Sequence, residues 1–305
     1  MNILPRDKQI DIVAALCEGN GIRATARLTD TDRKTVARLA LQVGRGCAEL
    51  HDRVMVGLRV PRVELDELWA FVGKKQRNVT REDSLDIGDQ YTFIALASSA
   101  KAIIAYYTGK RDNISTNDFV RDLSERVLGR PEISSDGFRP YRTAIPAVFG
   151  ARVDYGQIVK TLSVTDLRKD AAHRYSPAEV VAVARDVVCG LPTEISTSYA
   201  ERGNLSVRTG CKRFARLTLS HSKKLTHHLA GISLYVAHYN FCRVHEALTP
   251  DVRHQNTPAM AVGVADHVWS IGELIGAALA AAPRGPVDTP SGRRHRFQVI
   301  EGDRC

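Results

Sequence analysis

The first forty residues carry apolar side chains at the spacing of helices. A helix is expected over 6–18, where Ile10 and Val13 share one side, and the glycines that follow would end it. A short helix is expected over 22–29, and a third from about residue 32 to residue 43. Three short helices in succession predict a small unit with the order of a helix-turn-helix.

The third of these helices is basic outside its apolar face. Thr31 or Asp32 can cap it, and Arg33, Lys34 and Arg38 point away from its apolar side. In a helix-turn-helix unit, such side chains would contact DNA. The alternative is a plain helical cap that makes no DNA contact.

Beyond residue 60 the period changes to that of strands. The segment 63–73 is apolar on both faces, as expected of a strand in the middle of a sheet. The strands expected at 91–98 and 101–108 are joined by a turn so short that they must form an antiparallel hairpin. Further along we expect a helix capped by Ser115 that continues to about 128, a strand over 132–135, a helix near 140–149, a strand near 152–162 and a helix from about 199. This order predicts an α/β fold, a mixed sheet flanked by helices.

The charge of the chain indicates its partner. Lys and Arg total 43 against 34 Asp and Glu, and the net charge of +9 favours an anionic partner, with nucleic acid the first candidate. An acidic membrane is the rival, but the chain has neither a run of about 18 apolar residues nor a lipidation signature. Charged residues interrupt the first 30 positions, so we expect a cytoplasmic protein without a secretory signal. Six scattered cysteines without a C-x-x-C pair favour free thiols.

Two aspartates occupy positions where a sheet can place functional carboxylates. Asp66 lies in the middle of the apolar strand, where an ionised carboxylate is costly unless it is paired, hydrogen-bonded or bound to metal. Asp136 ends another strand at a glycine turn. Taken alone, either residue could equally be a capping or salt-bridged aspartate.

A third carboxylate begins the most basic stretch of the chain. At about 100° per residue, a helix that continues to residue 216 places Arg208, Lys212 and Arg216 within about 60° of Glu201. Because these cations would repel one another without an anion, the stripe predicts contact with phosphate, whereas a solvated amphipathic helix is the alternative. The DNA contacts expected from this stretch are Arg202, Arg208, Lys212, Arg213 and Arg216.

Asp66, Asp136 and Glu201 come from a central strand, a strand end and a later helix, and they can converge on one site. Oxygen ligands suit Mg²⁺ or Mn²⁺. Two such ions about 3.5–4 Å apart can activate an attacking oxygen and stabilise a leaving one in phosphodiester displacement. The three carboxylates therefore predict a site for two ions that acts on nucleic acid.

Several segments resemble the insertion-sequence-one (IS-one) family of bacterial transposases, part of the retroviral-integrase-like superfamily. The matching segments are VELDELWAFVGKK (63–75), ISSDGFRPY (133–141) and YAERGNLSVRTGCKRFARLT (199–218), followed by 222–251 and 257–270. Together they cover most of residues 60–275. The third is the most specific, because E-R-x-N-L-x-x-R-x-x-x-K-R-x-x-R is a long pattern.

The resemblance implies a ribonuclease H-like fold and a DDE transposase, which would cut DNA at insertion-sequence ends and transfer the strands into target DNA. It assigns Asp66, Asp136 and Glu201 as the catalytic and metal-binding triad, with Arg208 and Lys212 contacting DNA near the cut. The partners would be terminal inverted repeats and target DNA, bound by a homo-oligomer in the bacterial nucleoid. Well-known members carry a zinc-binding cysteine cluster that this chain lacks, so end recognition would rest on residues 6–45 or another surface.

We expect three parts: a helix-turn-helix unit over 1–55, a ribonuclease H-like catalytic domain over 56–260, and a C-terminal helix with a basic flexible tail over 261–305. The polar segment 77–90 is expected to be an exposed loop. Two other functions stay open. A structure-selective nuclease on the same fold would cut DNA without joining it, and a catalytically decayed regulator would only bind DNA.

Overall fold

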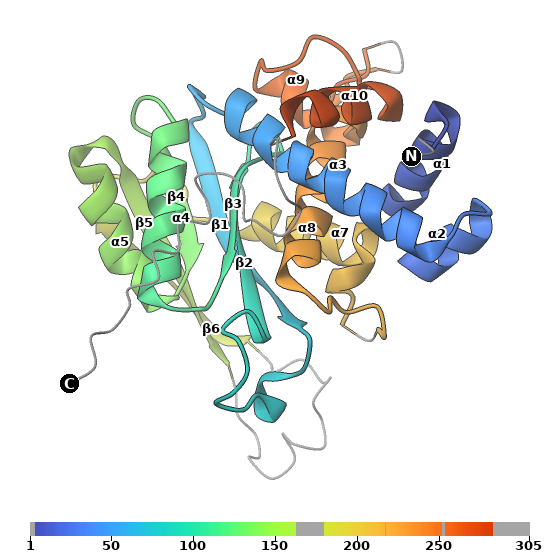
Figure 1. The fold of residues 1–305 in the computed structure, drawn as a ribbon. Coiled ribbons are helices and arrows are strands. Elements are labelled where there is room, and N and C mark those ends of the chain that lie inside the picture. Colours follow the sequence, from blue (N-terminus) through green and yellow to red (C-terminus); the bar gives the residue numbers. More distant parts are fainter. Residues whose placement is uncertain (1–3, 163–179, 217, 252–253, 283–305) are drawn as a thin grey trace.

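The fold is a six-stranded mixed sheet with helices on both faces (Figure 1). The computed structural model describes residues 4–162, 180–216, 218–251 and 254–282. The strands are β1 (Arg62–Val72), β2 (Gly88–Ala97), β3 (Ala102–Gly109), β4 (Glu132–Asp136), β5 (Asp154–Leu162) and β6 (Val180–Cys189). The α-helices are α1 (Arg6–Cys17), α2 (Ile22–Leu28), α3 (Arg33–Val54), α4 (Asn113–Arg126), α5 (Arg139–Phe149), α7 (Ser198–Gly210), α8 (Leu225–Ala237), α9 (Pro258–Ala261) and α10 (Ile271–Ala281).

The strands lie in the order β3-β2-β1-β4-β5-β6. β1, β2 and β3 form an antiparallel meander, β4 runs parallel to both β1 and β5, and β6 returns antiparallel to β5. This is the arrangement of a ribonuclease H-like α/β fold extended by one strand, so the predicted fold class is confirmed. β1 is central, as its apolar residues on both faces predicted.

Alternation along β1 sends its side chains into two different cores. Val63 and Leu65 pack with residues of α4 and α5, whereas Leu68 and Ala70 pack with residues of α7 and α8. Because side chains two apart share a face of a strand, Asp66 lies on the α7 side of the sheet. The helix that carries Glu201 therefore covers the face that carries Asp66.

A third core joins the N-terminal helices to helices from the other end of the chain. Buried residues of α1 and α3 pack with Leu234 of α8 and with Leu274 and Ala278 of α10. Gly44 and Gly46 of α3 allow this close approach, because a β-carbon at Gly44 would collide with the backbone of Ala230 and one at Gly46 with the carbonyl of Ala278. Figure 1 shows α3 crossing beside α8 and α10.

Two local predictions need correction, and one strand was not predicted. α3 was expected to end near residue 43, but it continues to Val54, because its glycines make close helix contacts that offset their low helix propensity. The cap of α4 is Asp112, whose carboxylate accepts a hydrogen bond from the backbone N–H of Ser115 at 2.8 Å, and not Ser115 itself. The strand β6, which pairs with β5, was not predicted.

A segment after α8 holds the edge strand β3. Asn240, in a single π-helical turn (His238–Cys242), accepts a hydrogen bond from the backbone N–H of Ile103 and donates one to its carbonyl, at 3.1 and 2.8 Å. The Tyr239 hydroxyl donates to the carbonyl of Lys101 at 2.9 Å. Tyr239 and Asn240 therefore stabilise the sheet at its β3 edge.

The predicted basic tail, residues 284–305, lies outside the described residues. Within them the cysteines are free, as expected: Cys17, Cys47, Cys189, Cys211 and Cys242. No helix in the described ranges is long and apolar enough to cross a membrane.

Candidate active site

The strand register brings Asp66 and Asp136 to the same level of the sheet. β1 and β4 are parallel neighbours, with Glu64 opposite Ser134, so both chains reach an aspartate two residues further on. The Asp136 carboxylate accepts a hydrogen bond from the backbone N–H of Phe138 at 3.0 Å. Its side chain is 43% exposed. Asp136 is therefore open to solvent at the end of β4, beside the more buried Asp66.

Asp66 is a carboxylate in an unfavourable position for its charge. It accepts hydrogen bonds from the backbone N–H of Glu67 at 2.8 Å and from the Asn204 amide of α7 at 2.7 Å. Burial is the main cause that raises the pKa of Asp66 to about 6; the hydrogen bond from Glu67 opposes it, and the negative charges of Asp136 and Glu201 add to the rise. Asp136 and Glu201 therefore both lie within range of the charge of Asp66.

Glu201 lies in the first turn of α7, on the same side of the sheet as Asp66. Its carboxylate forms an ion pair with Lys160 of β5 and accepts a hydrogen bond from the Thr197 hydroxyl at 2.9 Å. α7 packs against β1 and β2 through Ala200, Asn204 and Val207. Glu201 thus lies on the Asp66 side of the sheet, and its charge is paired with that of Lys160.

The three carboxylates carry the oxygen atoms that a divalent ion prefers as ligands. In this structure they are not arranged around a common ion site. In the described part of the chain, no three His, Cys, Asp or Glu side chains are close enough together to hold a metal. The donor set fits Mg²⁺ or Mn²⁺, because it is made of carboxylates whose mutual repulsion a cation would relieve. To reach such an ion, Glu201 would have to leave Lys160.

A second carboxylate on β1, Glu67, was not singled out from the sequence. It points to the opposite face, where Arg111 donates to it at 3.1 Å and also lies 3.9 Å from Asp136. The guanidinium of Arg111 stacks 4.0 Å over the ring of Phe138. The signal available in the sequence was the pair Asp66-Glu67 inside an apolar strand, which places carboxylates on both faces of the sheet.

Burial of Glu67 predicts an unusual pH dependence of stability. Burial, followed by the charge of Asp136, raises the pKa of Glu67 to about 7. A carboxyl with a raised pKa stabilises the fold fully below its unfolded value of about 4.3, and this contribution is lost as pH rises to about 7. We expect the Tm of the metal-free protein to fall between pH 5 and 8. The Tm of the Glu67→Gln variant should fall less steeply over the same range, as measured by thermal scans. An equal fall in both proteins would contradict this prediction.

The basic stretch after Glu201 is not one continuous helix, which corrects the predicted stripe. α7 ends at Gly210, Cys211 is extended, and Lys212–Phe214 form a 3-10 turn. Gly210 packs against the ring of Tyr235, since a β-carbon there would lie 2.7 Å from the ring. Helical periodicity therefore relates Glu201 to Arg208, but not to Lys212 or Arg216.

Arg208 nevertheless lies beside another cation and near the carboxylates. Burial, and then the positive charge of Arg216, lower the pKa of Arg208, while the charge of Asp66 opposes that effect. Its guanidinium donates to the carbonyl of Phe214 at 3.2 Å. Two neighbouring arginines next to an acidic site form a surface suited to a phosphate group.

The other predicted DNA contacts of this stretch differ from one another in exposure. Arg202, Lys212 and Arg216 are exposed. Arg213 points inward, where its guanidinium donates to the Ser222 hydroxyl at 3.3 Å, and burial lowers its pKa. In this arrangement Arg213 stabilises the packing around Ser222.

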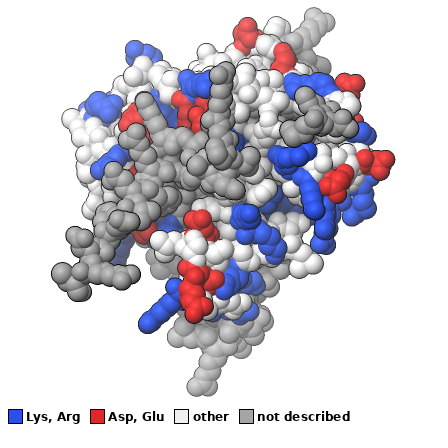
Figure 2. Space-filling view, viewed as in Figure 1, with Lys and Arg blue, Asp and Glu red and all other residues white. Residues whose placement is uncertain are grey.

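The N-terminal helices present the remaining predicted contacts. α2 and α3 are joined by residues 29–32, and the carboxylate of Asp32 caps α3 by accepting from the backbone N–H of Lys34 at 2.8 Å. Arg33, Lys34 and Arg38 are exposed. Figure 2 shows Lys and Arg side chains over α2 and α3, with a few acidic ones between them. This face has the charge expected of a nucleic-acid contact.

The turn between α1 and α2 adjoins the basic stretch. A β-carbon at Gly21 would lie 3.2 Å from the Ser220 hydroxyl and 3.8 Å from Cγ of Lys212. The N-terminal helices therefore contact the same part of the chain that follows the candidate site.

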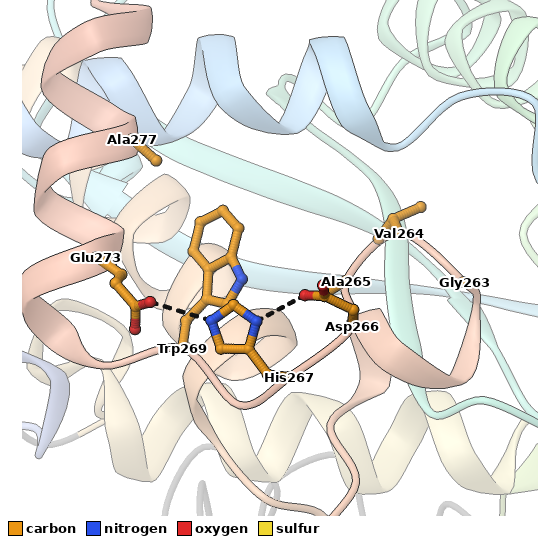
Figure 3. Close-up of a pocket in the computed structure, with 8 residues that line it drawn as sticks. All are labelled: Gly263, Val264, Ala265, Asp266, His267, Trp269, Glu273 and Ala277. Atoms are coloured by element: carbon orange, nitrogen blue, oxygen red, sulfur yellow. Dashed lines mark hydrogen bonds and ion pairs between the residues drawn. The ribbon is translucent and has the colours of Figure 1, made fainter.

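A pocket of about 530 Å³ lies elsewhere, beside α10, and is lined by none of the predicted site residues. Figure 3 shows His267 between two carboxylates, with Nδ1 2.6 Å from Asp266 and Nε2 3.0 Å from Glu273. These hydrogen bonds, with Asp266 first, raise the pKa of His267. The pocket has no part in the carboxylate site.

Comparisons with known proteins add little to this geometry. No protein-family model and no curated protein sequence matches the chain. Among solved structures, it is similar to a piggyBac transposase in a synaptic complex with hairpin DNA, at 12% identity and a TM-score of 0.31, covering 73% of this chain and 52% of that one. It is also similar to a pre-cleavage Mos1 transpososome, at 11% identity and a TM-score of 0.21, covering 77% and 78%. The chain thus spans about half the length of the piggyBac chain. Likenesses this low do not indicate an activity.

Proposed function

We propose that this chain is a metal-dependent DNA transposase resembling the IS-one family. Asp66, Asp136 and Glu201 would hold two Mg²⁺ or Mn²⁺ ions, which would activate the attacking oxygen and stabilise the leaving one during cleavage and strand transfer. The observation that carries the proposal is the charge coupling of Asp66, a half-buried strand carboxylate, to Asp136 and Glu201. A group of this kind beside two arginines is costly to a fold and useful to phosphodiester chemistry.

Different residues of the chain would bind DNA, orient the carboxylates and recognise the repeats. Arg208 and Arg216 would bind the phosphate next to the carboxylates, and Asn204 would orient Asp66 through its 2.7 Å hydrogen bond. The helix-turn-helix unit, 1–55, would bind the terminal repeats, and the domain 56–260 would cut and join them. A homo-oligomer on DNA would bring two ends together in the nucleoid.

The test is a cleavage and joining assay on labelled DNA ends taken from inverted repeats beside the gene. With Mg²⁺ or Mn²⁺, we expect nicking at the repeat ends and transfer of the strands into a second DNA, and no product with EDTA. Cutting without joining would identify a structure-selective nuclease. Metal-independent binding without any cutting would identify a DNA-binding regulator, and absence of inverted repeats would count against a mobile element.

Recognition of the ends can be tested through α3. The triple variant Arg33→Ala, Lys34→Ala, Arg38→Ala should lose its preference for repeat ends over unrelated DNA, because these exposed cations would read the repeat. The slope of log affinity against log salt should fall by up to about 0.9 for each phosphate that the variant no longer neutralises. Gel-shift titrations at several salt concentrations measure both. Arg121→Ala, at an exposed arginine of α4, is the matched control. Unchanged selectivity in the triple variant would move recognition to another surface.

A further inference from the structure

Glu64 is a buried carboxylate on the same face of β1 as Asp66, and only 4% of it is exposed. Its Oε2 accepts two hydrogen bonds from the start of α7, from the backbone N–H of Tyr199 at 2.8 Å and of Ala200 at 2.9 Å. These are the two residues that precede Glu201. A strand side chain thus binds the helix end that carries the third predicted carboxylate.

The first backbone N–H groups of a helix have no partner within the helix, and an N-cap side chain usually supplies one. In α7 the N-cap residue is Thr197, and its side chain makes no capping hydrogen bond. The Thr197 hydroxyl donates instead to the Glu201 carboxylate. Glu64 therefore takes the capping role from another element, and its charge suits the positive end of the helix dipole.

Two residues of β1 bind successive turns of α7. Glu64 holds the first turn, and Asp66 accepts a hydrogen bond from Asn204 in the second. The segment before the helix has separate ties to β4, where the backbone N–H of Ser196 donates to the Ser134 hydroxyl at 3.3 Å. The hydrogen bonds to β4 fix the position of the segment before α7, whereas the hydrogen bonds to β1 orient the helix itself.

We propose that Glu64 is a positioning residue that holds Glu201 in place relative to Asp66 by capping α7 from β1. This inference rests on the proposed function, because the relation between these two carboxylates matters only if they share an ion. Glu64 is not itself proposed as a metal ligand, since its Oε2 already accepts two backbone hydrogen bonds.

The experiment compares Glu64→Ala, Glu64→Gln and Ser270→Ala in the full chain. Ser270 caps α10 through a capping box with Glu273, far from the carboxylates in sequence, so its variant is a control for loss of a helix cap. Mn²⁺ binding is measured by calorimetry at pH 8, and exchange of backbone amides over residues 197–204 by mass spectrometry.

We expect Glu64→Ala to exchange faster over 197–204 and to bind Mn²⁺ about 10–100-fold more weakly, the usual effect of losing a residue that orients metal ligands. Glu64→Gln keeps an oxygen that can accept both hydrogen bonds, so its Mn²⁺ affinity should stay within a few-fold of the wild type. Ser270→Ala should melt at a lower temperature with unchanged Mn²⁺ affinity.

Two results would overturn the inference. Unchanged exchange and Mn²⁺ affinity in Glu64→Ala would mean that Glu64 does not position α7. A loss in Glu64→Gln of more than about 100-fold would make Glu64 a metal ligand, and this variant decides the question even if Glu64→Ala does not fold. Faster exchange in Glu64→Ala, with no Mn²⁺ binding and no DNA cleavage by the wild type, would count against the proposed function and leave the anchoring of α7 in place.

Discussion

Replacing Asp66 by Asn is expected to slow DNA cleavage and joining by more than about 100-fold, since losing residues that merely orient metal ligands costs about 10–100-fold. The substitution keeps the shape of the side chain and removes a negative charge from the group that would attract two dications. DNA binding should stay equal or tighten, because a charge that repels phosphate has gone. A strand-transfer assay beside a gel-shift titration measures both effects.

Loss of folding can be separated from loss of chemistry in this variant. Burial disfavours the ionised form of Asp66, so neutral Asn should leave the Tm at pH 8 equal or higher. Asp136→Asn and Glu201→Gln should match Asp66→Asn in the assay. Asp118→Asn, at an exposed carboxylate on α4, should react like the wild type. Wild-type rates in Asp66→Asn would remove Asp66 from the site and make Glu67 the next candidate.

The second large effect concerns the contact between α3 and α10. Gly46→Ala should reduce the free energy of unfolding by about 1–3 kcal/mol, the usual cost of overpacking a core. The added β-carbon would collide with the carbonyl of Ala278, which is backbone and can yield only if one helix moves. Urea unfolding followed by circular dichroism gives this difference.

Gly276→Ala is the matched control within the same pair of helices. Its β-carbon would meet only the flexible end of Arg6, at 3.4 Å, so the gain in helix propensity should leave the protein equally stable or up to about 1 kcal/mol more stable. If Gly46→Ala unfolded at the urea concentration of the wild type, the close packing of α3 on α10 would be wrong.

The features that could be predicted from the sequence depend on neighbours along the chain. Apolar residues on both faces of 63–73 indicated a central strand, and the short turn after 98 indicated the hairpin; both are confirmed. The positions of Asp66 in a central strand, Asp136 at a strand end and Glu201 in a later helix followed from the same reasoning. Their role as a metal-binding triad stays a prediction.

The features that could not be predicted depend on contacts between distant segments. The low helix propensity of glycine predicts that a helix ends near Gly44 and Gly46. Both nevertheless lie inside α3, because α8 and α10 approach the helix there. Gly210, the last residue of α7, likewise packs against the ring of Tyr235, 25 positions further on. The partners of the carboxylates, Lys160 and Arg111, come from other strands or loops, so no local spacing points to them.

The core shared by the two ends of the chain has a consequence for protein synthesis. The helices α1 and α3, which are translated before α8 and α10, bury Ile12 and Val36 in a core with residues of those helices that are translated up to 269 residues later (Ala281 after Ile12). On the ribosome these helices therefore lack the part of their packing that α10 supplies until α10 has emerged. The core around α1 and α3 is thus completed only when α10 packs, so a chain that stops before residue 271 would leave part of its apolar side exposed to water and to aggregation.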